Sequence, residues 1–259
     1  MRIYIMVSDD IILKPRVLYR LLQRRGTDVC GVAEIRRKSP RKTRRPDYMT
    51  QRRLMGIKGR LILGLCDYSL RVLQYLPLPS FIKSRLSTRN VCSFFTVPYE
   101  YVRDVNDPKF IARLSDLKLD IIVSCQGQIF SEELLQVPRI ACVNCHPAKL
   151  PKYRGMWPIV AAMCNGDDTI GVTAHTMIKA IDKGAIVCQQ EFRTSRAYSF
   201  MDNCVLAHEL YPDVILEALD VIENKGIGDC PWVPADAPYY DGPSPEELNK
   251  LRSTGSRMV

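Results

Sequence analysis

The sequence predicts an α/β fold in which a mostly parallel, Rossmann-like sheet carries helices on both faces. The opening apolar run at 2–7 alternates as a buried strand does, and apolar residues then recur at helical spacing from Val17 to Leu22 before Gly26. A second apolar run follows at 28–33. Strand, helix and strand in this order begin a parallel sheet.

The same alternation continues along the chain. We expect strands at 119–124, 140–144, 170–177 and 185–192, and helices at 108–117, from about 131, at 202–224 and at 245–252. A chain of 259 residues with 46% hydrophobic content can bury one substantial core. We therefore assign 1–228 to one main domain, with an insertion at 36–100 and a short C-terminal extension at 229–259.

The insertion carries most of the positive charge. The chain has a net charge of +9, and eleven Lys or Arg but one acidic residue lie between Arg36 and Arg60. Prolines and weak apolar periodicity predict an inserted loop over 36–60, and 61–86 reads as one or two amphipathic helices. Residues 36–86 could contact a membrane surface. A flap over a charged substrate, RNA contact and a solvated loop are the alternatives.

Cysteine usage and the N-terminus predict a cytoplasmic protein that is peripheral, at most, to the inner face of a membrane. Ten cysteines without a secretory signal are typical of reduced thiols. The run from Met1 to Val7 reads as a strand because it is short and lacks a cleavage pattern. Ser8-Asp9-Asp10 replaces the glycine-rich first turn of dinucleotide-binding proteins, so we expect no nicotinamide cofactor.

The segment Cys142-Val143-Asn144-Cys145-His146 matches the C-x-x-C-H pattern of haem attachment. A zinc site that adds Cys125 is a second interpretation, although no second paired-ligand motif is present. A redox pair would need its first cysteine at a helix N-terminus. We favour a fourth interpretation, in which no metal is bound and the two cysteines are wall thiols beside a more important histidine.

A longer run contains the same histidine. It reads Asn144-Cys145-His146-Pro147-Ala148-Lys149-Leu150-Pro151-Lys152-Tyr153-Arg154-Gly155, followed by Asn165-Gly166, Gly171-Val172-Thr173 and Ile181-Asp182-Lys183-Gly184. This series resembles the folate-dependent formyltransferases, whose pattern has Ser-Leu where Ala148-Lys149 stands here. The resemblance covers about 119–192 and fails over 36–100 and beyond 225. It implies the formyltransferase fold, with 1–228 as the catalytic domain.

The resemblance implies N-formyl transfer from 10-formyltetrahydrofolate and three catalytic residues, Asn144, His146 and Asp182. The reaction passes through a tetrahedral oxyanion and needs proton transfer. An Asn amide can hold the oxyanion, and His146 lies two residues along the strand, on the same side. Asp182 would orient the imidazole. A protein that keeps the fold without turnover is the alternative, which the intact trio argues against.

Further residues follow from the same resemblance. The loop Gln126, Gly127, Gln128 and Ile129, together with Ile181, is expected at the folate, while Ser8 and Arg154 are candidates for substrate binding. Arg154 suits a phosphate, although a salt-bridged arginine is equally compatible. Gly127 alternatively serves a tight turn.

The acceptor that the resemblance favours is a nucleotide-linked amino sugar. The stretch from Met177 to Val187 is most similar to amino-sugar nucleotide formyltransferases, while the aminoacyl-tRNA and glycinamide ribonucleotide types remain alternatives. We expect a small-molecule amine as the partner and no nucleic acid. Apolar and proline-rich stretches at 61–86 and 231–245 predict the surfaces of a homodimer.

Overall fold

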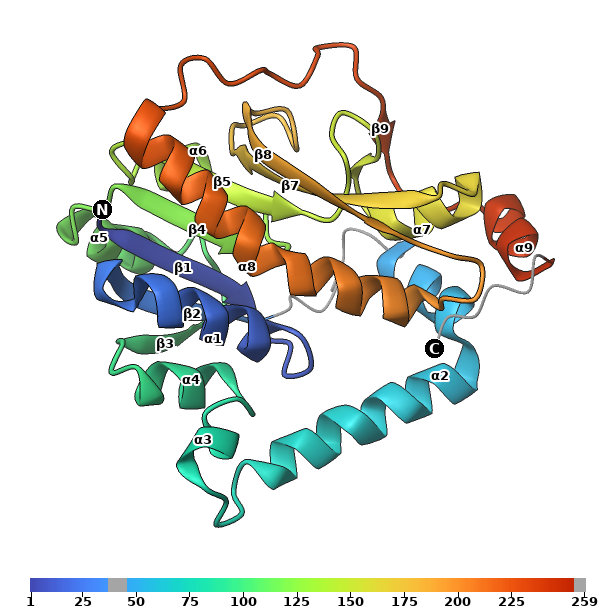
Figure 1. The fold of residues 1–259 in the computed structure, drawn as a ribbon, viewed down its shortest axis with the longest axis horizontal. Helices are drawn as coiled ribbons and strands as arrows, with labels where there is room; N and C mark the ends of the chain where they lie inside the picture. The colour runs from blue at the N-terminus through green and yellow to red at the C-terminus, as the bar shows by residue number, and fades with distance from the viewer. Residues whose placement is uncertain (37–45, 254–259) are drawn as a thin grey trace.

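A seven-stranded sheet forms the centre of the protein (Figure 1). The structure is a computed structural model that describes residues 1–36 and 46–253. The strands run in the order β3-β2-β1-β4-β5-β7-β8. Their bounds are Ile3–Ser8 for β1, Val29–Ile35 for β2, Tyr99–Val102 for β3, Ile121–Cys125 for β4, Ala141–His146 for β5, Thr169–Thr176 for β7 and Ile186–Arg193 for β8. Strands β1 to β5 pair in parallel, and only the β5–β7 and β7–β8 pairs of this sheet are antiparallel. The predicted mostly parallel sheet is confirmed.

Helices cover both faces of the sheet, as predicted. They are α1 (Lys14–Arg25), α2 (Pro46–Leu73), α3 (Ser80–Lys83), α4 (Thr88–Phe94), α5 (Pro108–Asp116), α6 (Glu132–Leu135), α7 (Pro158–Asn165), α8 (Phe200–Lys225) and α9 (Pro245–Ser253). One buried cluster joins α1, α4, α7 and α8 to one face, and a second cluster joins α5 and α6 to the other. Local sequence fixes several starts: Ser199 and Asp202 form a capping box on α8, and Asp107 caps α5 ahead of Pro108.

Strand order places a crevice at the carboxyl ends of the central strands. The chain moves from β1 outward to β2 and β3 on one side, then returns to build β4 and β5 on the other. Ligands of open α/β sheets bind at such a reversal. Ser8, Cys125 and His146 end β1, β4 and β5 at this edge.

The predicted loop over 36–60 is partly wrong, because α2 begins at Pro46. Proline is favoured in the first turn of a helix, where its missing N–H has no partner to lose. Gly56 interrupts this helix with a φ of 59°, so two helices meet there at a kink. Residues 37–45, the rest of the predicted loop, lie outside the described residues.

The last part of the predicted 36–100 insertion belongs to the sheet. Strand β3 pairs with β2, and Val91 and Cys92 of α4 are fully buried in the main core. Helix α7 was not predicted from the sequence. Six of its eight residues are buried, so the helix has no amphipathic pattern.

The C-terminal extension packs on the main domain. Its strand β9 (Tyr239–Tyr240) pairs with β6 (Arg154–Gly155), directly after the loop 147–153 that follows β5. Helix α9, which was predicted, buries Leu248 and Leu251 in the main core. Among the described residues, no helix combines the length and the apolarity that crossing a membrane requires.

Candidate active site

Two adjacent strands gather four polar side chains at the carboxyl end of β5. Asn144 and His146 alternate along β5 and therefore point to the same face. Their direct partners on β7 are His175 and Thr173, respectively. Residues opposite each other in an antiparallel pair share a face, so all four side chains meet there.

Asp182 reaches this cluster from the loop between β7 and β8. Its Oδ1 lies 3.5 Å from Nε2 of His175, and its Oδ2 lies 3.8 Å from Nδ1 of His146. The N–H of Gly155 donates a hydrogen bond of 2.9 Å to Oδ2. The structure thus brings together Asn144, His146 and Asp182, the three residues predicted to be catalytic.

His146 is positioned as a neutral base. Its Nε2–H donates to the carbonyl oxygen of Tyr153 at 3.1 Å, which leaves the lone pair on Nδ1, toward Asp182. Burial lowers the pKa of His146 from 6.5 and outweighs the opposite effect of Asp182. A neutral imidazole held in one tautomer can accept a proton at Nδ1.

His175 orients Asn144, although no sequence motif had marked it. Its Nδ1–H donates to the carbonyl oxygen of Thr176 at 2.8 Å, so in the neutral ring Nε2 accepts from Nδ2 of Asn144 at 3.2 Å. One N–H of the Asn144 amide remains for an oxygen of the substrate. A signal was present: His175 is one of only three histidines and stands two residues after Thr173.

The Asp182 carboxylate is strongly held in its charged form. Burial raises the pKa of Asp182, but the contact with His175, the positive charge that His146 carries once it is protonated in acid, and the N–H of Gly155 outweigh it and lower this pKa to about 2. Asp182 therefore carries its negative charge at neutral pH. Its backbone φ of 50° is unusual for a residue with a side chain, and such conformations persist where the surroundings impose them.

Replacing Asp182 with asparagine should reduce the dependence of stability on acid. Because folding lowers the pKa of this carboxyl from 3.8 to about 2, its contribution is present above pH 3.8 and is lost as the pH falls toward 2. The shift corresponds to about 2 kcal/mol. Between pH 5 and about pH 2, the free energy of unfolding measured in urea should fall by about 2 kcal/mol less in Asp182→Asn than in the wild type.

The exposed Asp168 provides the control. Asp168→Asn should follow the wild-type curve. Equal acid dependence in all three proteins would show that Asp182 makes no such contribution.

The Gly171-Val172-Thr173 motif holds the 147–153 loop in place. A Cβ on Gly171 would lie 2.6 Å from backbone and side-chain atoms of Lys149, so only glycine allows the loop to pass this close to β7. The Thr173 hydroxyl donates to the carbonyl of Ala148 at 2.6 Å and accepts from the N–H of Leu150 at 3.2 Å. Gly184 likewise lets the loop between β7 and β8 pass close to β7, because a Cβ on Gly184 would overlap the carbonyl oxygen of Thr176.

Arg154 is buried and links the loop between β7 and β8 to the C-terminal extension. Its Nε donates to the carbonyl of Ile181 at 2.9 Å, and a guanidinium nitrogen donates to the carbonyl of Ala237 at 2.6 Å. The guanidinium also lies over the ring of Tyr239. These contacts favour a positioning part for Arg154. Its predicted binding of substrate stays a prediction.

Of the residues predicted at the folate, Gln126 to Ile129 follow β4 at the carboxyl edge of the sheet, and Ile181 lies in the loop between β7 and β8. The side chain of Gln128 bonds main-chain groups of Arg36, Arg103 and Val105, and the side chain of Gln126 bonds the main chain of Gln128.

The apolar members of this set are solvent-facing. Ile129 is 65% and Ile181 37% exposed. Nothing within 4 Å would meet a Cβ on Gly127, and its φ is not positive, so the fold does not require glycine there. Ser8 is half-buried at the end of β1, with β4 between it and β5. The assignments of these residues remain predictions.

The two cysteines of the C-x-x-C-H pattern lie on opposite faces of the sheet. Cys142 packs in the α5–α6 cluster and Cys145 in the α1–α8 cluster. Burial raises the pKa of both thiols, to about 12 for Cys142. Over the described ranges, no group of three or more His, Cys, Asp or Glu is arranged to hold a metal ion. This geometry argues against Cys142 and Cys145 as joint ligands of a metal or haem.

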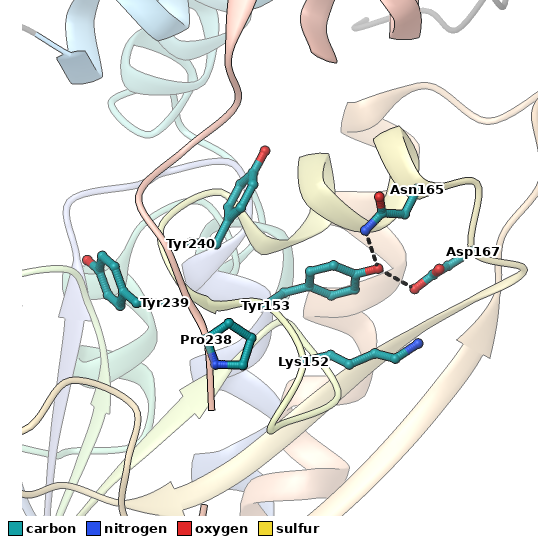
Figure 2. A pocket seen from close by; sticks show the side chains of 7 residues that line it. All are labelled: Lys152, Tyr153, Asn165, Asp167, Pro238, Tyr239 and Tyr240. Carbon is teal, nitrogen blue, oxygen red and sulfur yellow. Dashed lines mark hydrogen bonds between the residues drawn. The ribbon is translucent and has the colours of Figure 1, made fainter. Parts of the chain in front are cut away.

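A pocket of about 530 Å³ opens beside the 147–153 loop (Figure 2). It is lined by Lys152, Tyr153, Asn165, Asp167, Pro238, Tyr239 and Tyr240. The hydroxyl of Tyr153 donates to Asp167 at 2.8 Å and accepts from Asn165 at 2.9 Å. His146 does not line this pocket, but the two are adjacent because His146 bonds the backbone of Tyr153.

Comparison with known proteins places the chain among formyl transferases. The sequence model of the formyl transferase family matches residues 82–215, just over half of the chain. A methionyl-tRNA formyltransferase of Borrelia garinii is 36% identical over 134 residues, which are 51% of this chain and 42% of that protein. The bifunctional polymyxin resistance protein ArnA of Wigglesworthia glossinidia brevipalpis is 42% identical over 98 residues, 38% of this chain and 15% of that protein. The matches thus span less than half of these relatives.

Solved structures share the fold. WlaRD, a sugar 3N-formyltransferase solved in the presence of dTDP and 5-N-formyl-THF, has a TM-score of 0.59 at 14% identity, over 98% of this chain and 78% of that one. Phosphoribosylglycinamide formyltransferase from Anaplasma phagocytophilum has a TM-score of 0.57 at 16% identity, over 94% of this chain and 99% of that one. These superpositions show a shared fold, and because the family model matches over half of its residues, the chain belongs to the formyl transferase family.

Proposed function

We propose that this chain transfers a formyl group from 10-formyltetrahydrofolate to the amino group of a nucleotide-linked amino sugar. The observation that carries formyl transfer is the cluster of Asn144, His146, His175 and Asp182, because it combines an oriented amide donor with a neutral base. Family membership supports the same chemistry.

Each residue has a defined part in this chemistry. The free N–H of Asn144 donates to the formyl oxygen as negative charge develops there. Nδ1 of His146 accepts the proton that the attacking amine loses, and Asp182 stabilises the resulting imidazolium. The new bond joins the amine nitrogen to the formyl carbon, the bond from that carbon to N10 of the folate breaks, and N10 takes up a proton.

The folate donor fits the carboxyl edge of the sheet. Ile129 presents an exposed apolar side chain there and Ile181 presents another from the β7–β8 loop, and apolar side chains suit a flat pterin ring. The polar side chains of Gln126 and Gln128 bond main-chain groups and hold the loop between them in shape. The donor supplies the activated formyl group, and these residues would hold it.

The pocket in Figure 2 supports a nucleotide-linked acceptor. Tyr239 and Tyr240, from the C-terminal extension, line it together with Tyr153, and Lys152 lies at its edge. Aromatic rings can stack on a nucleotide base, and a lysine can pair with a diphosphate. Tyr153 joins this pocket to the base His146, since its ring lines the pocket and its carbonyl accepts from the imidazole.

Methionyl-tRNA is the second candidate acceptor. The match to the Borrelia garinii methionyl-tRNA formyltransferase, at 36% identity, favours it, as does the run of eleven Lys or Arg between Arg36 and Arg60. In that case the basic run would meet phosphates of the RNA. A small-molecule acceptor would not require it.

A panel of amines distinguishes the candidates. The purified chain is supplied with 10-formyltetrahydrofolate and, in turn, with dTDP- and UDP-linked amino sugars, methionyl-tRNA or glycinamide ribonucleotide, and mass spectrometry detects the added formyl group. We expect a formylated nucleotide sugar. A product only with methionyl-tRNA would favour the second candidate, and no product with any amine would contradict formyl transfer.

Asn144→Ala should lower kcat with the accepted amine by roughly 10²–10³-fold, because one donor to the developing oxyanion is removed. KM should change much less, since the donor acts mainly in the transition state. Asn224→Ala, which removes an exposed amide on α8, is the control and should match the wild type. An unchanged kcat in Asn144→Ala would remove Asn144 from the mechanism.

A further inference from the structure

Helix α2 presents a continuous apolar face to solvent. No residue from Arg60 to Lys83 is buried. The large side chains on the outward face recur four and three residues apart, and we name them the α2 stripe: Leu61, Leu65, Tyr68, Val72 and Tyr75. This spacing places Leu61, Leu65, Tyr68 and Val72 along one side of the helix, and Tyr75 continues the row in the turn that follows Leu73. Leu65 is 64% and Tyr75 82% exposed.

The apolar surface continues beyond α2. Leu76, Phe81 and Ile82 are exposed in the turn that follows and in α3. Both helices lie outside the layered body of the protein (Figure 1). Single exposed apolar residues are common on soluble proteins, but a contiguous row of large ones marks an interaction surface.

The charge around the stripe is strongly positive. From Pro46 to Arg89 the sequence has eight Lys or Arg and only two Asp. One of the two, Asp67, is paired with Arg71 at 2.8 Å. The sequence just before α2 is more basic still, since seven of the ten residues from 36 to 45 are Lys or Arg.

We propose that the α2 stripe binds the surface of an anionic lipid membrane, with the helix lying in the interface. Large apolar and tyrosine side chains enter the boundary between headgroups and acyl chains, while flanking lysines and arginines meet lipid phosphates. Contact with a second copy of this chain is disfavoured, because it would bring two positively charged surfaces together. An anionic lipid surface complements the same charge.

The proposed membrane face is connected to the catalytic edge of the sheet. Arg71 on α2 donates to Oδ1 of Asp9 at 3.0 Å, and Asp9 directly follows β1. The carboxyl ends of β1, β4 and β5 lie along this edge, so a membrane-bound α2 holds the candidate active site near the lipid surface. Membrane binding itself does not depend on which amine is formylated, or on formyl transfer at all.

Vesicle flotation with the full chain tests the proposal. The probes are vesicles of phosphatidylcholine alone and vesicles containing 30% phosphatidylglycerol, and the control for charge is 0.5 M salt. We expect the wild type to float with the anionic vesicles only, and salt to weaken but not abolish binding. The double variant Leu65→Glu/Tyr68→Glu should bind about tenfold or more weakly, because two apolar contacts become charged.

A matched variant separates the stripe from added charge alone. Cys66 is exposed and lies neither three nor four residues from any member of the stripe, so Cys66→Glu should retain most of the binding. Circular dichroism and thermal unfolding check that all variants fold. Absence of wild-type binding, or equal binding by the double variant, would overturn the proposal. So would sedimentation showing a dimer that the double substitution dissociates without any vesicle binding, which would assign the stripe to a second copy.

Discussion

Replacing His146 with alanine should lower kcat for formyl transfer by roughly 10²–10⁴-fold, the range typical of a lost general base. The structure gives the reason. Nε2 of His146 is committed to the carbonyl of Tyr153, and Nδ1 is left as a base beside Asp182. No other described imidazole is oriented in this way, since Nδ1 of His175 donates to Thr176 and His208 lies on α8. Single-turnover rates with a saturating acceptor measure the effect on the chemical step.

The control for this substitution is His208→Gln, on α8 outside the site, which should keep the wild-type rate once folding is verified. A His146→Ala enzyme within a few fold of the wild type would show that another group takes the proton.

The pH profile adds an independent check. Because burial lowers the pKa of His146 below 6.5, the acid limb of kcat/KM should lie below that pH. The charge of Asp182 raises this pKa, so Asp182→Asn should move the limb to still lower pH. A shift in the opposite direction would contradict the electrostatic role of Asp182.

Gly184→Ala should have the largest effect on stability. A Cβ at this position would lie 1.7 Å from the carbonyl oxygen of Thr176, well inside van der Waals contact. This oxygen belongs to the main chain of β7, so it cannot move without the strand. The loop that carries Asp182 must therefore shift, or β7 must part from it. We expect a loss of at least about 3 kcal/mol in the free energy of unfolding, measured in urea, together with a loss of activity.

Gly228→Ala is the matched control. Nothing within 4 Å would meet its Cβ, and its φ is not in the left-handed region, so its stability should remain close to that of the wild type. Equal stability of the two variants would show that the loop before β8 can move aside freely.

The resemblance to formyltransferases implied Asn144, His146 and Asp182, and the strict period of a strand added that two of them share a face. Asn144 and His146, two residues apart, had to share a face of β5. His175 was missed because its role arises from pairing between β5 and β7, and the register of that pairing is not visible along one strand. The burial of Arg154 was equally hidden, since its partner Ala237 lies 83 residues away in the C-terminal extension.

The same limits apply to the fold. Strands and helices with one polar face were found, whereas α7, which is buried on nearly all sides, carries no periodic signal. Helix α2 was read as a loop over its first part because the segment contains prolines and has weak apolar periodicity. Pro46 in fact begins the helix, and Gly56 only kinks it.

The division of Cys142 and Cys145 between the two faces of β5 has a consequence for oxidation. Residues three apart in an extended strand are separated by about 10 Å, beyond the roughly 7 Å that a disulfide can bridge. Burial also keeps both thiols protonated, which makes them poor nucleophiles toward oxidants. A disulfide between Cys142 and Cys145 therefore cannot distort the strand that positions Asn144 and His146, although Cys145 lies between these two residues.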